Sequence, residues 1–491
     1  MIIRLRLTPG VSLIGAVTLW ACGGEVTTGP ADQQQPSAAQ LAFRTEPSAT
    51  AGEAISPAIK VEIVDAFGNV VTTTTDAVTI AIGTNPAGGT LSGTATVNAV
   101  AGVASFSDLT IGKAGSGYTL AASASGLSSA TSSAFTVRFP FTIVGHGSLA
   151  RTVTSDVRVH GTVAYTGEFD FWADGTNPVT DALLVWDVSN PATPRVAASV
   201  VVDGVRSVID VKIRADGTVG VITHQFSGSG ITLLDLSDPL SPQVITRFTP
   251  GALSLGVHNT WIEGDYVYAA GGAREGGRLT IIDISNPADP QVVADFYAGL
   301  SGAHDVYVRD GLAFVSHWDA GLVILDVGNG IAGGTPTNPV EVGRTLTVGG
   351  STHSAWYWPA ARYVFVSEES RRPGVVHVVD VSDLSNPVEV ATFGVSGHTA
   401  HNLSMDEARG ILYVSWLGGG LRAIDVSGEL SGRLETQGRE VGYTGQAMGS
   451  VCPIIENLCR PGTLSWGVQL HDGLVYVSDV NSGLWVLRLE F

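Results

Sequence analysis

The sequence predicts an all-β protein in which an immunoglobulin-like β-sandwich is followed by a seven-bladed β-propeller. Two features of the composition point to many short strands and tight turns: glycine accounts for 61 of the 491 residues, and only 14% of the residues are charged. After the first two dozen residues, no long stretch has the 3.6-residue period of a helix. The chain from about residue 150 onward also repeats itself, which is typical of propellers.

The N-terminus has the features of an export signal. Arg4 and Arg6 precede a short apolar segment over Val11–Ala21, which is too short to span a bilayer and therefore fits a cleaved signal. The segment Leu19-Trp20-Ala21-Cys22 resembles a bacterial lipobox, with Trp20 in place of the usual small residue. The resemblance implies a lipoprotein signal peptide over residues 1–22 and lipidation of Cys22. We therefore expect an exported, lipid-anchored protein at the outer membrane or cell surface, with a flexible tether over 23–39.

The two remaining cysteines and the net charge limit the kinds of bond and partner that the chain can have. Cys452 and Cys459 lie close together in a Gly/Pro-flanked insertion, and in an oxidising compartment we expect a disulfide between them. The formal net charge of −19 comes without a basic stripe, which excludes a nucleic-acid partner. The expected partners are instead the membrane, through the lipid anchor, and a protein, glycan or small ligand.

Residues 40–137 are predicted to form the sandwich. The segment Ile59–Ile63 alternates apolar and charged residues, as a half-buried strand does, and a second strand is expected at Val70–Thr74 after the turn Asp65–Asn69. The segments Val64–Val70 and Gly102–Phe106 resemble bacterial immunoglobulin-like repeats of surface adhesins. The resemblance implies that this domain acts as a spacer.

Residues 141–491 contain seven similar units. Equivalent positions fall at Ser155, Ile209, His258, His304, His353, His401 and Trp466. Most units close with Asp-x-Ser, as in Asp187-Val188-Ser189, which we interpret as a structural turn because these short side chains bond to nearby backbone. The pattern resembles the LVIVD-repeat family of bacterial propellers, which implies the fold but no particular function. The last unit has only three strands, so we expect Phe141–Val144 to supply its fourth and close the ring.

Four consecutive units carry histidine at one position: His258, His304, His353 and His401. The first strand of a propeller blade is innermost, so these side chains should ring one mouth of the channel and could bind zinc or copper. His317, Glu368 and His398 are weaker candidates near the same mouth. The alternative is that the repeated histidines only bond neighbouring backbone. Trp318, Trp356, Trp358, Trp416 and Trp466 are expected near this mouth as packing between blades or as the floor of a ligand pocket.

Two kinds of function remain open. The first is a non-enzymatic binding or interaction module held at the surface, with the sandwich as spacer. The alternative is a metal-dependent oxidoreductase or hydrolase that uses the histidines. A distant resemblance to selenium-binding proteins, which are copper-containing propeller enzymes, keeps the enzyme alternative open, but none of their residues can be matched here. No Gly-x-Ser-x-Gly or His-Glu-x-x-His motif is present in the sequence.

Overall fold

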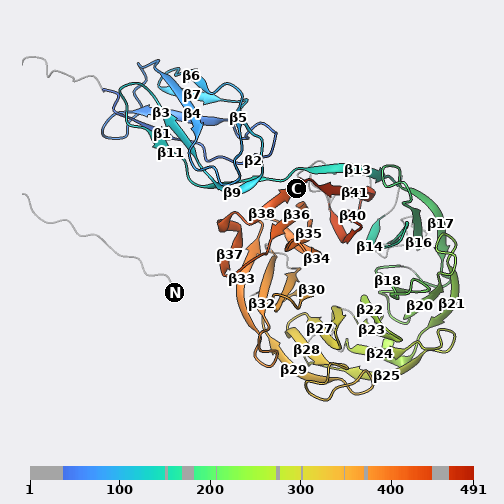
Figure 1. Ribbon diagram of the computed structural model, residues 1–491. Helices are drawn as coiled ribbons and strands as arrows, with labels where there is room; N and C mark the ends of the chain where they lie inside the picture. Colours follow the sequence, from blue (N-terminus) through green and yellow to red (C-terminus); the bar gives the residue numbers. More distant parts are fainter. Residues whose placement is uncertain are drawn as a thin grey trace, which may run out of the picture.

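The computed structural model describes residues 37–149, 153–168, 182–205, 207–271, 277–299, 302–347, 349–369, 374–444 and 464–491 (Figure 1). The predicted signal peptide, Cys22, most of the tether, and the pair Cys452 and Cys459 lie outside these residues. Within them the structure contains strands and two 3₁₀ turns, η1 (Gly251–Leu253) and η2 (Leu434–Gln437), but no α-helix. The all-β prediction is thus confirmed for the described chain. No helix in it is long and apolar enough to cross a membrane.

The first twelve strands form four small sheets, with orders β1-β3-β7, β11-β10-β4-β6, β2-β12-β9 and β5-β8. Their bounds are β1 (Gln40–Phe43), β2 (Ala49–Thr50), β3 (Ile59–Val64), β4 (Ala77–Ile82), β5 (Leu91–Ser92), β6 (Thr96–Asn98), β7 (Val103–Phe106), β8 (Thr110–Ile111), β9 (Gly115–Tyr118), β10 (Leu120–Ser123), β11 (Ala130–Thr131) and β12 (Phe135–Arg138).

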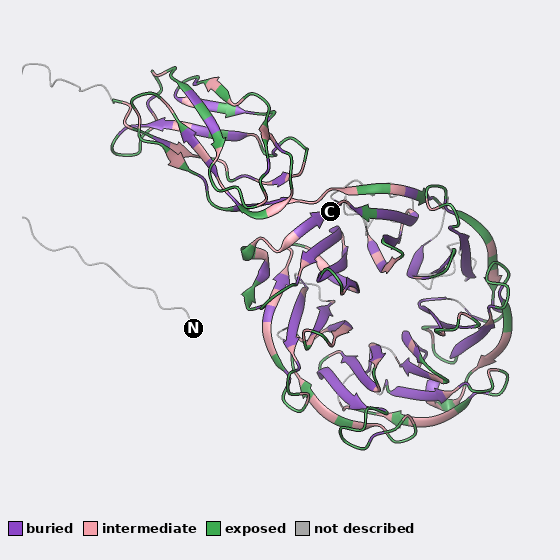
Figure 2. Cartoon of the chain, viewed as in Figure 1, coloured by how far each residue is buried: buried purple, intermediate pink, exposed green. Residues whose placement is uncertain are grey.

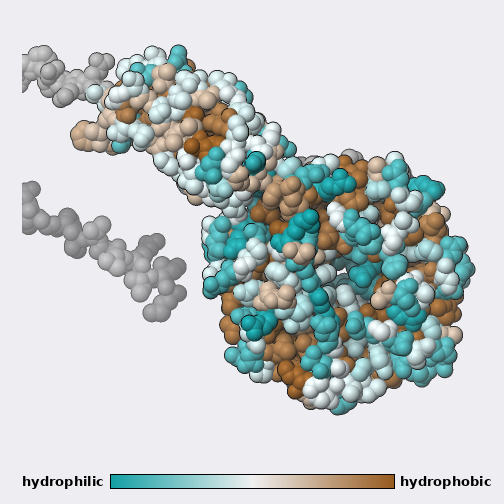
Figure 3. All heavy atoms as spheres, viewed as in Figure 1, coloured by the Kyte–Doolittle hydropathy of each residue, from teal (hydrophilic) through white to brown (hydrophobic). Residues whose placement is uncertain are grey.

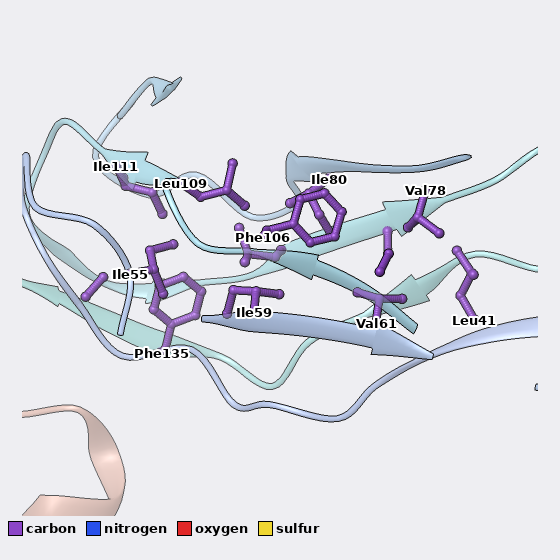
Figure 4. Packing of buried hydrophobic residues seen from close by; sticks show 14 of the residues in the cluster. Leu41, Ile55, Ile59, Val61, Val78, Ile80, Phe106, Leu109, Ile111 and Phe135 are labelled. Atoms are coloured by element: carbon purple, nitrogen blue, oxygen red, sulfur yellow. The ribbon is translucent and has the colours of Figure 1, made fainter. Parts of the chain in front are cut away.

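One hydrophobic core joins these N-terminal sheets. Ile59 and Val61 of β3, Ile80 of β4 and Phe135 of β12 belong to the same buried cluster (Figure 4). The alternation predicted for this segment is confirmed, because the apolar residues of β3 are buried while Lys60 is exposed. The immunoglobulin-like assignment of this domain stays a prediction.

The strand expected at Val70–Thr74 is wrong. Val70 makes a single bridge to Val64, the chain then turns, and the next strand, β4, begins only at Ala77. The buried Val71 donates its N–H to the carbonyl of Ile63. This short segment therefore folds back on β3 as an extended turn, and its run of threonines lies largely exposed. β-Propensity alone did not distinguish such a turn from a strand.

The remaining strands form seven sheets, which stand as blades around a central channel (Figure 1). Blades 1 to 4 are β14 (Thr154–His160), β15 (Val163–Glu168), β16 (Ala182–Asp187), β17 (Arg195–Val201); β18 (Val211–Ile213), β19 (Val219–Thr223), β20 (Ile231–Asp235), β21 (Gln243–Phe248); β22 (Asn259–Glu263), β23 (Tyr266–Ala270), β24 (Leu279–Asp283), β25 (Gln291–Phe296); and β26 (Asp305–Arg309), β27 (Leu312–His317), β28 (Gly321–Asp326), β29 (Val340–Thr345). Blades 5 to 7 are β30 (Thr352–Trp358), β31 (Tyr363–Glu368), β32 (Val375–Asp380), β33 (Val388–Gly394), β37 (Gly432–Arg433); β34 (Thr399–Asp406), β35 (Ile411–Leu417), β36 (Gly420–Asp425), β38 (Glu440–Tyr443); and β39 (Ser465–His471), β40 (Leu474–Asp479), β41 (Gly483–Leu489), β13 (Phe141–Gly147).

The ring closes as the sequence predicted. β13, the strand nearest the N-terminus of the propeller, pairs antiparallel with β41, the last strand, from Phe141 opposite Leu489 to Gly147 opposite Leu484. The final blade is therefore built from both ends of the repeated region. This pairing covers what would otherwise be an exposed sheet edge.

Burial is greatest in the middle of each blade. The second and third strands of each blade are almost wholly buried, whereas the outermost strands, such as β17, alternate between exposed and half-buried residues (Figure 2). The Asp-x-Ser segments are structural turns, as predicted. Asp187 accepts a hydrogen bond from the Ser189 N–H at 3.0 Å, and Asp235, Asp283, Asp380 and Asp425 do the same with their own serines.

In blade 4 a single carboxylate organises a longer loop after the third strand. Asp326 is fully buried and accepts hydrogen bonds from five backbone N–H groups, those of Gly328, Asn329, Gly330, Ala332 and Gly334, at 2.7–3.1 Å. Burial by itself raises the pKa of Asp326, but these hydrogen bonds outweigh it and hold the pKa well below its usual range. The ionised form therefore contributes to stability.

We expect Asp326→Asn to lower the melting temperature by several degrees at pH 7, because an amide offers one acceptor oxygen where the loop uses two. A depressed pKa gives stability that is present above the unfolded-state pKa of about 3.9 and is lost as the pH falls below it. The difference between parent and variant should thus shrink below about pH 4 in thermal scans from pH 7 to pH 3. Asp283→Asn, the equivalent turn of blade 3, is the control and should change the melting temperature little. A constant difference at every pH would contradict this account.

The N-terminal domain contacts the ring at blade 6. Thr136 donates to the carbonyl of Gly438 at 2.7 Å, and Arg138 forms a salt bridge with Glu440 at 2.7 Å. Gly438 has a φ of 68°, and a Cβ there would lie 2.3 Å from the Thr136 hydroxyl. The junction consequently needs glycine for both its conformation and its close approach.

Candidate functional site

The four repeated histidines lie side by side in the channel. The ring centroids are 4.0 Å apart for His258 and His304, 4.6 Å for His304 and His353, and 4.0 Å for His353 and His401. Trp466, at the same position of blade 7, continues the row with its ring 4.4 Å from that of His401. We call the four imidazoles the histidine arc. His304, His353 and His401 are at most 3% exposed.

A β-bulge lies at two of the four histidines of the arc, His353 and His401. The pairing of the first two strands shifts register between Thr352 and Ala355 in blade 5 and between Ala400 and Leu403 in blade 6, and blades 1 and 7 shift at the same place. A bulge re-aims side chains at the start of the inner strand, so the histidine and the residue after it can both approach the channel. Sequence periodicity does not reveal a bulge, and it was not predicted.

In four of the seven blades a hydroxyl near the end of the second strand holds this geometry in place. Ser367 accepts the N–H of Ser354 at 3.1 Å, Ser415 accepts the N–H of Asn402 at 3.0 Å, and Ser478 and Thr223 do the same for Gly467 and Asp210. Ser415 also donates to the carbonyl of Trp466 at 2.6 Å, which ties blade 6 to blade 7. The repeated Ser or Thr within the last three residues of these second strands is the sequence signal that could have found this device.

Several nitrogens of the arc have no hydrogen-bond partner among the described residues: both ring nitrogens of His304, Nδ1 of His353 and Nε2 of His401. His401 is oriented through its other nitrogen, because Nδ1 lies 3.0 Å from the carbonyl of Trp466 and donates to it in the neutral ring. That bond leaves Nε2 unprotonated, with its lone pair pointing away from the Trp466 carbonyl and available to a ligand, as in metal-binding histidines. Each buried unpartnered polar atom destabilises the folded state by about 1–3 kcal/mol. The arc therefore lowers the stability of the protein unless a ligand binds to these nitrogens.

Burial keeps the arc neutral. It lowers the pKa of His258 and of His401 to about 4, and it holds the pKa of His304 and His353 well below the ordinary value for imidazole. Neighbouring imidazoles would repel a second positive charge, which adds to the lowering at His304 and His353. The histidines are consequently uncharged at neutral pH and present lone pairs.

Glu369 completes the set of potential metal ligands. One ligand atom each from His258, His304 and His353 lies within 4.8 Å of the others, and the same holds for His353, Glu369 and His401. His353 belongs to both groups, and its Nε2 is 3.8 Å from a carboxylate oxygen of Glu369. Sequence reasoning selected Glu368 and missed Glu369, the next residue, because the exact end of the strand decides which of the two faces the arc.

The three weaker candidates belong to neither group. Glu368 lies 3.3 Å from Nε2 of His377, whose Nδ1 is 2.7 Å from Glu389, so it is engaged within its own blade. His317 is buried with both nitrogens unpartnered. His398 packs beside Gly419 at the end of blade 6. Of the tryptophans, Trp318 lies 4.4 Å from His304, whereas the fully buried Trp416 packs on Phe393 in a blade core.

A second tier of polar residues follows the arc along the inner strands: Asp156, Asp210, Asn259, Asp305, Ser354 and Asn402. Lys212 joins two of them, donating to Asp156 at 2.9 Å and to Asp210. Asn402 also donates to Asp156 at 2.8 Å. Burial raises the pKa of Asp210 to about 7 against the attraction of Lys212. Asn259, Asp305, Ser354 and Asn402 each directly follow a histidine of the arc in the sequence, whereas Asp156 and Asp210 follow Ser155 and Ile209.

The channel also contains a cavity of about 310 Å³. Its lining includes the second tier except Asp210 and, farther along the inner strands, Arg158, Trp261, Tyr307 and Trp356. The space-filling view shows a depression at the centre of one face of the ring, bordered by many hydrophilic residues (Figure 3). The channel thus holds a neutral nitrogen-rich arc and a separate aromatic and polar cavity.

Four segments of the chain, residues 154–202, 257–297, 302–347 and 374–394, match the LVIVD repeat. They fall in blades 1, 3, 4 and 5. This chain is a β-propeller repeat protein. The LVIVD resemblance predicted from the sequence is confirmed for these segments.

Similar solved structures include the computationally designed Ika8 protein, with 11% identity and a TM-score of 0.44, and the β-propeller domain of Cps50 (Swd1) from Myceliophteria thermophila, with 12% identity and a TM-score of 0.46. Each similarity covers 70% of this chain and 99% of the other. No curated protein matches the sequence.

Proposed function

We propose that this protein is an exported, lipid-anchored binding protein whose propeller holds a transition-metal ion, zinc or copper, in its channel. The observation that carries the proposal is the histidine arc, in which His304, His353 and His401 are buried with unpartnered nitrogens. Neutral imidazoles are common ligands of both metals. A bound ion would take up the lone pairs whose burial otherwise destabilises the fold.

The structural alternative is that the histidines only pack against each other. The close contact of the tilted rings would favour this alternative if their nitrogens were bonded to backbone, as Nδ1 of His401 is. The remaining nitrogens lack such partners within the described part of the chain, and the Glu369 carboxylate stands beside the arc. Both features favour a ligand site over packing alone.

Metal analysis of the protein purified without an affinity tag tests this function. We expect about one zinc or copper ion per chain after titration and dialysis, measured by mass spectrometry of the elements. A chain that retains neither metal would overturn the proposed metal site and return the arc to a packing role.

The lipid anchor is a second part of the proposal, and it rests on the sequence around Cys22. In cells of a lipoprotein-exporting bacterium, Cys22→Ala should move the protein from the membrane fraction to the soluble fraction, because the acyl chains that hold it are lost. The matched control is Cys452→Ala, which should fractionate like the parent. Equal membrane retention of parent and Cys22→Ala would exclude lipidation at this residue.

The N-terminal domain is proposed to act as a spacer between the membrane and the ring. Its contacts with blade 6 support a defined orientation of the propeller: Arg138 pairs with Glu440, and the N–H of Phe139 donates to the carbonyl of Val441 at 2.6 Å. A fixed junction would hold the propeller in one orientation relative to the N-terminal domain.

A further inference from the structure

The cavity in the channel has one aromatic wall. Trp261, Tyr307 and Trp356 come from the inner strands of three consecutive blades, with ring centroids 4.5 Å and 5.1 Å apart. The neighbouring rings are tilted to one another by 53° and 37°, and together they form an aromatic wall against which the ring of a ligand can pack. These residues lie three positions after the histidines of the arc, so the cavity is distinct from the metal site.

The cavity also holds a cation without an ion pair. Arg158 of blade 1 reaches toward the aromatic wall, with its Cζ 5.7 Å from the ring centroid of Trp261. Its guanidinium makes no hydrogen bond or salt bridge with any residue that the structure describes, whereas the nearby Lys212 is paired with Asp156 and Asp210. A guanidinium of this kind binds a carboxylate through two parallel hydrogen bonds.

The charge balance favours a ligand with a single negative charge. Arg158 is the one cation of the lining that lacks a salt bridge among the described residues, and the carboxylate of Asp156 shares the cavity. A doubly charged phosphate would meet this carboxylate with only one free cation to offset its charge. The single negative charge of a carboxylate is compensated by Arg158 alone.

Two buried acceptors complete the lining. The side-chain oxygens of Asn259 and Asn402 have no hydrogen-bond partner among the described residues, and Asn259 is only 8% exposed. Each leaves a lone pair that a ligand hydroxyl could satisfy. The ligand should therefore carry hydroxyl groups as well as a charge.

We propose that this cavity binds a small molecule in which a hydroxylated six-membered ring carries a carboxylate. The ring packs against the wall of Trp261, Tyr307 and Trp356, the carboxylate pairs with Arg158, and hydroxyl groups donate to Asn259 and Asn402. Two sources share this chemistry, namely a sugar acid and a hydroxylated aromatic acid. The inference deepens the proposed binding role but does not depend on a metal in the arc.

Calorimetric titration of the full chain, stripped of metal with a chelator, tests the proposal. The probes are galacturonate and 4-hydroxybenzoate, with galactose as the ring without the charge and acetate as the charge without the ring. We expect at least one ring carboxylate to bind at least tenfold more tightly than galactose and acetate. The ring carboxylate that binds more tightly identifies the source.

Arg158→Gln should weaken binding of that probe at least tenfold, and Arg158→Lys should weaken it less because the charge remains. Arg195→Gln, on the exposed outer strand of the same blade, is the control and should bind like the parent. The proposal is overturned if neither ring carboxylate binds the parent, if acetate binds as tightly, or if a folded Arg158→Gln chain binds unchanged. Because the metal has been removed, failure of the metal site would leave these results unaffected.

Discussion

A chain that lacks residues 1–148 is expected to melt at a much lower temperature than one that lacks residues 1–138. The two deletions remove the same N-terminal domain and differ only in the segment that contains β13. That strand pairs with β41 over its whole length, and Phe141 and Val144 pack against the cores on either side of the last blade. Losing it leaves a three-stranded blade with an open edge and should cost about as much as emptying one or two core positions, roughly 3–8 kcal/mol.

A point variant tests the same closure in the full chain. A Cβ at Gly145 would lie 2.1 Å from the carbonyl oxygen of Pro191 in the neighbouring blade. Gly145→Val should therefore displace β13 from its position beside β41. Thr142→Val, at an exposed position of the same strand, should leave the melting temperature nearly unchanged. Similar melting temperatures for both deletions and for Gly145→Val would mean that the ring holds together without this strand.

The repeats made most of the propeller predictable. A unit that recurs at nearly constant spacing must place equivalent residues at equivalent positions, so the predicted starts fall within two residues of the inner strands. The strand that closes the ring followed from counting strands in the last unit. Neither inference needed the details of side-chain packing.

The finer geometry of the site was less accessible to sequence reasoning. The position of the histidines was predicted, but the bulges that let His353 and Ser354 both approach the channel were not. A bulge depends on which backbone groups find partners, here the hydroxyl of Ser367, and not on hydrophobic periodicity. The choice between Glu368 and Glu369 depends on the same local geometry.

The cavity was also missed for a physical reason. Arg158, Trp261 and Trp356 lie on different blades, so nothing in the linear sequence relates them except their position in each repeat. Aligning the repeats at the third residue after the histidines would have collected the aromatic wall. The sequence interpretation had instead placed Trp356 at the histidine mouth.

The largest effect on metal binding is expected for His353→Ala. His353 belongs to both groups of potential ligands and lies between His304 and His401 in the arc, so its loss leaves either group with two ligands. We expect zinc or copper affinity to fall at least about a hundredfold, because an incomplete ligand set leaves the ion under-coordinated. His401→Ala should weaken binding less if the ion sits with His258, His304 and His353.

Thermal scans with and without metal give an independent readout, since an ion that binds only the folded chain raises its melting temperature. The rise should occur in the parent and in His471→Ala, whose histidine lies at the far end of β39, and should vanish in His353→Ala. Binding should weaken as the pH falls, because protons compete for the imidazole lone pairs. With the pKa of His258 and His401 near 4, that loss should come well below pH 6.5, where ordinary imidazoles protonate. An unchanged metal affinity in His353→Ala would show that the arc is not where the ion binds.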